Sequence, residues 1–188
     1  MKIILLPIIA LALSAFAHAD DLTCASESIV SKVNDKEVMR GRIIGNTHAV
    51  EPGKKFLAGL LLVAQPGWHT YSANPGDAGI ATTIEWRLPT GFKAGKTHWP
   101  KSKTKKYADD ILCNVFDNEV LLITEIVPPN EIPEGEIVIK ANVGWSCGTE
   151  MFSLMPIESQ VVLNLKRGDS KLPANAELFS KHLALAEK

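Results

Sequence analysis

The feature that most constrains the fold is an alternating segment at residues 136–145, EIVIKANVGW. One parity holds Ile137, Ile139, Ala141, Val143 and Trp145, while Glu136, Lys140 and Asn142 share the other. Because successive side chains of a β-strand point to opposite faces of a sheet, this segment predicts a strand with one face in a core. Alternation or apolar composition predicts four further strands, at residues 56–64, 82–88, 119–127 and 160–165.

Turn signals separate these strands. Pro-Gly pairs occur at 52–53, 66–67 and 75–76, and the run LPTG occupies 88–91. No strand–helix alternation is seen, so the pattern predicts an all-β fold of the β-sandwich type. The tail departs from it, because Pro173 can open a short C-terminal helix from about Ala174 to Ala186.

The first 19 residues predict a secretory signal peptide. Lys2 is followed by an apolar run to Phe16 and by the small-x-small cleavage pattern Ala17-His18-Ala19. The run is shorter than the roughly 20 residues that a membrane-spanning helix needs, so an anchor is less favoured. The predicted organisation is a signal peptide at 1–19, a sandwich domain at 20–170 and a helical tail at 171–188, with no stable membrane insertion after cleavage.

Charge and cysteine content narrow the function. Twenty Lys and Arg balance 21 Asp and Glu, which argues against nucleic-acid binding or a membrane-surface role. The basic cluster 101–106, KSKTKK, is expected on a solvated loop. Cys24, Cys113 and Cys147 leave an odd thiol in an oxidising compartment. Cys24 lies close to the predicted cleavage site and is expected in a mobile end.

The stretch 66–79, PGWHTYSANPGDAG, carries a resemblance to a known family. Together with Trp86, Trp99-Pro100, the 119–127 strand and Cys147, it resembles the periplasmic N-terminal domain of the DsbD thiol:disulfide interchange family, especially the ScsB type. The likeness extends from about Gly45 to Leu165. It implies an immunoglobulin-like sandwich in the periplasm whose cysteine pair takes electrons from a membrane-embedded donor and passes them to periplasmic redox proteins. Neither a cofactor nor a metal is predicted.

One family feature is missing. Family members place a second cysteine a few residues after the first, whereas Met151, Ser153 and Leu154 stand in that region here. Exchange needs a second sulfur to resolve the mixed disulfide. Cys113 corresponds to the segment after the family's cap loop, so we predict Cys147 and Cys113 as catalytic residues, with Cys113 resolving. A disulfide between them requires Cα atoms within about 7 Å. By the same comparison, Tyr107 is expected to shield Cys147.

Other interpretations of these side chains remain open. Cys147 continues the parity of Val143 and Trp145, so it can be a structural core residue. Cys147, Met151 and Met155 offer soft sulfur ligands for Cu(I), although core filling by the methionines is favoured. Packing is likewise favoured over ligand stacking for the aromatic side chains Trp68, Tyr71 and Trp99. For His69 and His98, packing or surface roles are favoured over metal binding. Gly76 and Gly79 indicate backbone positions with positive φ angles.

Two functions follow from this sequence. The first is a periplasmic thiol-disulfide exchange domain that acts through Cys147, with or without Cys113. The enzyme class that would fit this function is a thiol-disulfide oxidoreductase. The alternative is a redox-inactive binding module of the same fold, used for protein–protein contact or copper handling.

Overall fold

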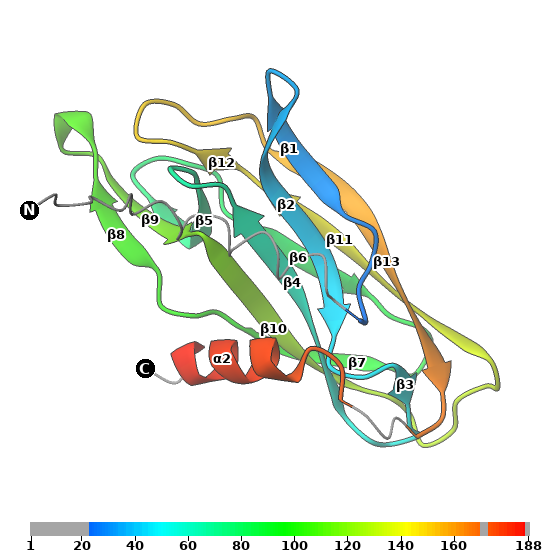
Figure 1. Cartoon of the computed structure of the whole chain (residues 1–188). Helices are drawn as coiled ribbons and strands as arrows, with labels where there is room; N and C mark the ends of the chain where they lie inside the picture. The colour runs from blue at the N-terminus through cyan, green and yellow to red at the C-terminus, as the bar shows by residue number, and fades with distance from the viewer. Residues whose placement is uncertain (1–22, 170–172, 187–188) are drawn as a thin grey trace, which may run out of the picture.

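Two sheets, antiparallel except for one short edge strand, form the body of the molecule (Figure 1). The computed structural model describes residues 23–169 and 173–186, so the predicted signal peptide lies outside the described residues. Sheet A has the order β1 (Ile29–Val33), β2 (Lys36–Gly45), β4 (Phe56–Ala64), β10 (Glu119–Val127), β7 (Lys93–His98). Sheet B has the order β3 (Ala49–Val50), β13 (Ile157–Arg167), β11 (Glu136–Trp145), β6 (Thr83–Arg87), with β3 parallel to β13.

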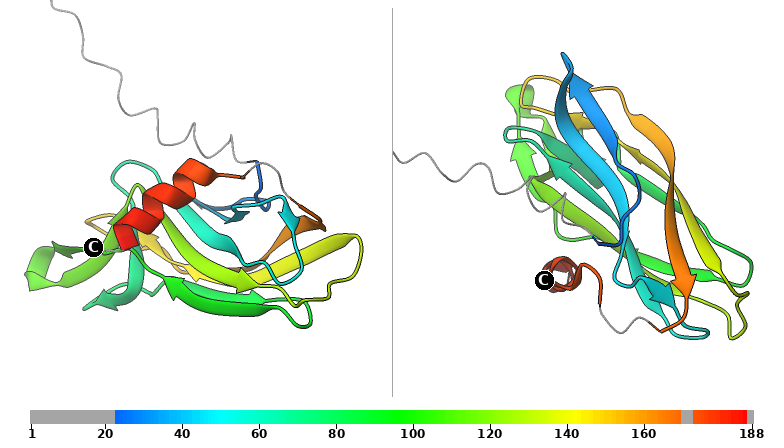
Figure 2. Two further views of the ribbon diagram at one scale, coloured as in Figure 1. Left: turned by 90° about the horizontal axis from the view of Figure 1, so that it is seen from below. Right: turned by 45° about the vertical axis from the view of Figure 1, so that its right-hand side comes forward.

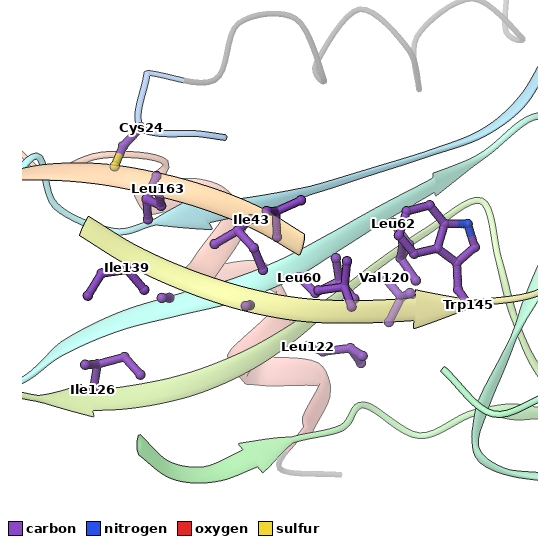
Figure 3. Packing of buried hydrophobic residues seen from close by; sticks show 14 of the residues in the cluster. Cys24, Ile43, Leu60, Leu62, Val120, Leu122, Ile126, Ile139, Trp145 and Leu163 are labelled. Atoms are coloured by element: carbon purple, nitrogen blue, oxygen red, sulfur yellow. The ribbon is translucent and has the colours of Figure 1, made fainter. Parts of the chain in front are cut away.

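The predicted all-β sandwich is confirmed. Strands β4, β10 and β11 have the bounds that the sequence predicts, while β6 and β13 differ from prediction by a few residues at their ends. The core between the sheets is built from the inward faces of these strands (Figure 3). Ile139 and Trp145 of β11 share this core with side chains of β4, β10 and β13, among them Leu60, Leu62, Leu122 and Leu163.

A third sheet, sheet C, extends the sandwich at one end (Figure 1). Its order is β12 (Cys147–Gly148), β5 (His69–Gly76), β9 (Leu112–Asp117), β8 (Lys103–Lys106), and a 3-10 turn at Ala108–Asp110 joins β8 to β9. Strand β12 follows β11 after one residue, and β9 leads into β10 after Asn118. The expected loop at 101–106 is therefore wrong in part, because its last four residues pair with β9 as an edge strand. Lysines are common on such edges because they discourage further strand pairing.

Helix α2 (Ala176–Ala186) covers the outer face of sheet A (Figure 2). Phe179 packs there on outward-facing residues of β2, β4 and β10, among them Ile44, Leu61 and Leu121. Strand β4 is thus covered on both faces, which explains its almost uninterrupted apolar sequence. The short C-terminal helix is confirmed, beginning two residues after the predicted start.

The chain before β1 is also held in place. Cys24 is buried in the core, and its thiol donates a hydrogen bond to the Thr47 carbonyl at 3.0 Å. Asn175, just before α2, donates from its amide to the carbonyls of Cys24 and Gly45 at 3.1 and 2.9 Å. The expectation that Cys24 lies in a mobile end is therefore wrong, because these contacts fix it beside the start of the helix.

Candidate functional site

Cys147 lies in the main core. It is 1% exposed and belongs to the same cluster as Trp145, so its predicted inward orientation is confirmed. Its thiol hydrogen-bonds with the buried Ser31 side chain of β1, which also accepts a hydrogen bond from the Trp145 indole N–H at 3.2 Å. Burial raises the pKa of the Cys147 thiol, and the Ser31 hydrogen bond opposes this only in part. The thiol is therefore protonated at neutral pH and is a weak nucleophile.

Cys113 occupies a different environment. It lies on β9 between Gly76 of β5 and Lys105 of β8, and it is 2% exposed. Its thiol donates to the Ala78 carbonyl at 3.4 Å. Its neighbours are the small cluster of Tyr71, Val115 and Tyr107, separate from the main core. All three cysteines are free thiols.

Strand β5 separates the two predicted catalytic cysteines. Cys147 pairs with Thr70 of β5, which pairs on its other side with Phe116 of β9. Two strand spacings amount to about 9–10 Å, which already exceeds the roughly 7 Å limit for a disulfide. Cys113 is three positions from Phe116, so it points to the opposite face of sheet C. The structure therefore does not bring the predicted pair together, and the Cys113–Cys147 disulfide cannot close in this arrangement.

A β-hairpin continues from Cys147. The Thr149 N–H donates to the Phe152 carbonyl at 2.9 Å, and the Leu154 N–H donates to the Cys147 carbonyl at 2.8 Å. Leu154 thus lies across from Cys147 and packs against the same core. Of the three positions considered for the family's second cysteine, Leu154 is the one directly opposite Cys147, which the sequence alone did not distinguish.

Exposed apolar side chains crowd the hairpin. Met151 is 92% exposed, Met155 is 85% exposed, and Phe152 is also exposed. We call these three side chains the hairpin surface. Phe152 packs edge to face on the half-buried Trp68, with ring centroids 5.6 Å apart. Ile80 and Ile111, in segments next to sheet C, and Leu112, the first residue of β9, are further exposed apolar residues of the described chain.

A hollow lies beside the hairpin, on the same face of sheet C as Cys113. His69 lies in its lining, stacks on Tyr107, and has its Nε2 atom 3.4 Å from the Tyr107 hydroxyl oxygen. Burial and then Lys105 lower the pKa of His69, so its ring is neutral at physiological pH. Burial, with the neighbouring Tyr71, raises the pKa of Tyr107 to about 12. The lining consists of Gly67, Trp68, His69, Lys105, Asp117, Asn118 and the hairpin residues Thr149 to Phe152.

The aromatic side chains of this region differ from the sequence predictions at one position and agree with them at two. Tyr107 packs in the cluster of Cys113, so the expectation that it shields Cys147 is wrong. The packing interpretation of Tyr71 and Trp99 is confirmed, since Tyr71 is buried and Trp99 stacks on Phe116. Ser31 was missed, because nothing in the sequence links the β1 segment to Cys147.

The geometry also bears on metal binding and membrane insertion. Cys147 is buried while Met151 and Met155 are exposed, so these three sulfur atoms do not share one accessible site. Within residues 23–169 and 173–186, no group of three or more His, Cys, Asp or Glu side chains is arranged to hold a metal ion. In the same part of the chain, no helix has the length and apolar character needed to cross a bilayer.

Comparisons with known proteins place this geometry in context. The periplasmic N-terminal domain of ScsB from Proteus mirabilis is 19% identical, with a TM-score of 0.56; the match covers 88% of this chain and 59% of that one. The chain therefore spans less than two thirds of that structure, and the likeness supports the immunoglobulin-like sandwich fold. The reduced N-terminal domain of DsbD from Neisseria meningitidis is 11% identical, covers 70% of this chain and 90% of that one, and has a TM-score of 0.39.

A match to a family model gives the clearest relationship. No curated protein matches the sequence. The model described as thiol:disulfide interchange protein DsbD, N-terminal, matches residues 41–162, which is more than half of the chain. The chain therefore belongs to the DsbD N-terminal domain family, which is involved in thiol-disulfide interchange.

Proposed function

We propose that this chain is a periplasmic partner-binding domain of the interchange family whose working contact is the hairpin surface. The observation that carries the proposal is that the thiols at one end of the molecule are buried while apolar side chains there are exposed. Cys147 and Cys113 are buried on opposite faces of sheet C, while Met151, Phe152 and Met155 project into solvent. The domain offers a partner an apolar contact but no internal dithiol.

The chemistry of the thiols supports this choice. Exchange requires a thiolate at the surface and a second sulfur to release the mixed disulfide. Cys147 has a raised pKa and almost no exposed surface. In contrast, exposed aromatic and methionine side chains are enriched at protein interfaces, where burial of their apolar surface on binding is favourable.

The partner class follows from the family and the charge. A net charge of −1 gives no electrostatic basis for nucleic-acid binding. The partners that fit are periplasmic redox proteins or a membrane-embedded electron donor. Such a partner would bind the hairpin surface with an apolar patch on its own surface.

Site-specific crosslinking tests the proposal. A photoreactive benzoylphenylalanine replaces the exposed Glu150, and the full chain is expressed in its natural host. We expect a discrete adduct that Phe152→Asp abolishes and the matched control Val162→Asp, on β13, retains. An adduct that is insensitive to Phe152→Asp, or equally sensitive to Val162→Asp, would refute the hairpin surface as the contact.

A second candidate function is thiol exchange through Cys147 alone, with Cys113 left out of the reaction. The observation that favours it is the shortness of β12, which has two residues and pairs with β5 only over Thr70 and His69. Short elements of this kind open locally at a smaller free-energy cost than the core. Opening of the hairpin would bring the thiol to solvent.

Oxidised glutathione distinguishes the two candidates. Under native conditions, the binding-domain proposal predicts no mixed disulfide and alkylation of Cys147 only after unfolding. The exchange candidate predicts a glutathione adduct that is lost in Cys147→Ser and retained in Cys24→Ser. An internal disulfide, seen as a mass lower by about 2 Da, would contradict both.

A further inference from the structure

Sulfur atoms in the described residues divide into a buried and an exposed group. The three cysteines are buried, and Met39 in β2 is 0% exposed. Met151 and Met155 are exposed on the hairpin. An oxidant that arrives from solvent therefore meets two thioethers before it meets any thiol.

The exposed thioethers lie on the hairpin surface, where oxidation changes the polarity of the proposed contact. Phe152, between them in the chain, is held against Trp68, and Met151 lines the hollow beside the hairpin. The turn is fixed by the Thr149–Phe152 backbone hydrogen bond, and the Met151 N–H donates to the Thr149 hydroxyl at 3.2 Å. The hairpin backbone is thus ordered by its own hydrogen bonds, and none of these involves a methionine side chain.

We propose that Met151 and Met155 form an oxidant-sensitive modification site for peroxides. The thioether sulfur attacks one peroxide oxygen, an S–O bond forms and the O–O bond breaks. Sulfur is oxidised by two electrons to the sulfoxide, and hydrogen peroxide is reduced to water. The sulfoxide is polar and remains open to reversal by methionine sulfoxide reductases.

The modification changes the hairpin surface from apolar to polar. Sulfoxide oxygens bind water strongly, so burying them in an apolar contact carries a desolvation cost that the thioethers lack. Oxidation therefore weakens partner binding while the fold and the buried cysteines are unchanged. This consequence rests on the proposed function, whereas the modification itself does not.

Peptide mass spectrometry tests the modification. The purified chain is treated with dilute hydrogen peroxide, and the gain of one oxygen, about 16 Da, is followed at each methionine. We expect Met151 and Met155 to react at least about ten-fold faster than Met39, whose oxidation must await opening of the core. Comparable rates at Met39 and the hairpin, or faster oxidation of the cysteines than of either hairpin methionine, would overturn the proposal.

A second measurement separates this inference from the proposed function. The crosslinking yield at position 150 is compared before and after peroxide, in the wild type and in a Met151→Leu/Met155→Leu variant. Each oxidised sample is compared with the untreated sample of the same protein, and we expect at least about a three-fold loss of yield in the wild type and no loss in the variant, because leucine cannot form a sulfoxide. If the untreated wild type forms no adduct, the binding proposal fails and the peroxide rates still decide the modification. If peroxide lowers the yield of the variant to the same extent, the proposed effect of methionine oxidation on binding is refuted.

Discussion

The two faces of sheet C show how a similar degree of burial can arise from different surroundings. On one face, Cys147 joins the main core and shares the Ser31 hydroxyl with Trp145. On the other, Cys113 lies in a small cluster beside a hollow lined by His69 and the Lys105–Asp117 ion pair. The first thiol is isolated by packing between sheets, and the second by the smaller cluster of Tyr71, Val115 and Tyr107. We therefore expect the faces to respond independently to substitution.

The largest effect is expected from Gly41→Ala, on the Cys147 side. A Cβ atom at Gly41 would lie 2.5 Å from the Trp145 ring and 2.9 Å from Leu62. Overpacking of this kind costs about 1–3 kcal/mol, and we expect the upper end because both neighbours are fully buried. Urea unfolding gives the change in the free energy of unfolding. Gly95→Ala is the matched control, since its Cβ would lie 3.4 Å from the nearest atom; equal losses in both variants would contradict the packing account.

A smaller loss is expected from Ser31→Ala. The substitution leaves the buried Trp145 indole N–H without its acceptor, which costs about 1–3 kcal/mol. It also removes the hydrogen bond that lowers the pKa of Cys147, so this pKa rises further. Urea unfolding measures the first effect, and the pH dependence of alkylation in a variant that keeps only Cys147 measures the second. Ser180→Ala, at an exposed position of α2, should change neither.

The separation of the faces is tested most directly by Leu154→Cys. The new thiol lies across the hairpin from Cys147, so oxidation is expected to join residues 147 and 154 and to leave Cys113 free. Mass spectrometry after mild oxidation should show the linked peptides, and the wild type should show no internal disulfide. A link from Cys113 to either residue would mean that the strand order around β5 rearranges.

The sequence predicted the centre of the sandwich better than it predicted sheet C. Strands β4, β10 and β11 were found because long apolar or alternating segments determine both the strand and the face that it buries. The inward orientation of Cys147 followed from the same parity. In contrast, the Pro-Gly pair at 75–76 indicated a turn, whereas β5 continues to Gly76 across a register shift. Strand β8 was not predicted, because its lysines are typical of a solvated loop.

The relation between Cys113 and Cys147 could not be predicted in this way. It depends on the pairing register of β12, β5 and β9, which arises from contacts between segments far apart in the chain. The family comparison brought the two segments to the same region of the fold. It did not reveal that one strand lies between them, or that their side chains point to opposite faces.

The smallest effect is expected from Asp117→Asn, on the Cys113 side. Burial alone would raise the pKa of Asp117, but hydrogen bonds and charges from Lys105 and Lys103 outweigh it and lower this pKa. Because the folded-state pKa lies below the unfolded-state value, the carboxylate stabilises the fold above about pH 4, and this contribution is lost as pH falls through the folded-state pKa. The pair with Lys105 is partly exposed, so we expect a loss of at most about 1 kcal/mol at pH 7.

Urea unfolding at pH 7 and pH 3, at low and high salt, checks this expectation. The difference between Asp117→Asn and the wild type should shrink both on acidification and on addition of salt, because protonation and screening each weaken the same ion pair. The alkylation rate of Cys147 should not change, since the Ser31 and Trp145 contacts lie on the other face. An altered rate would show that the charge network around the hollow is coupled to the core thiol, and the two faces of sheet C would then have to be treated as one site.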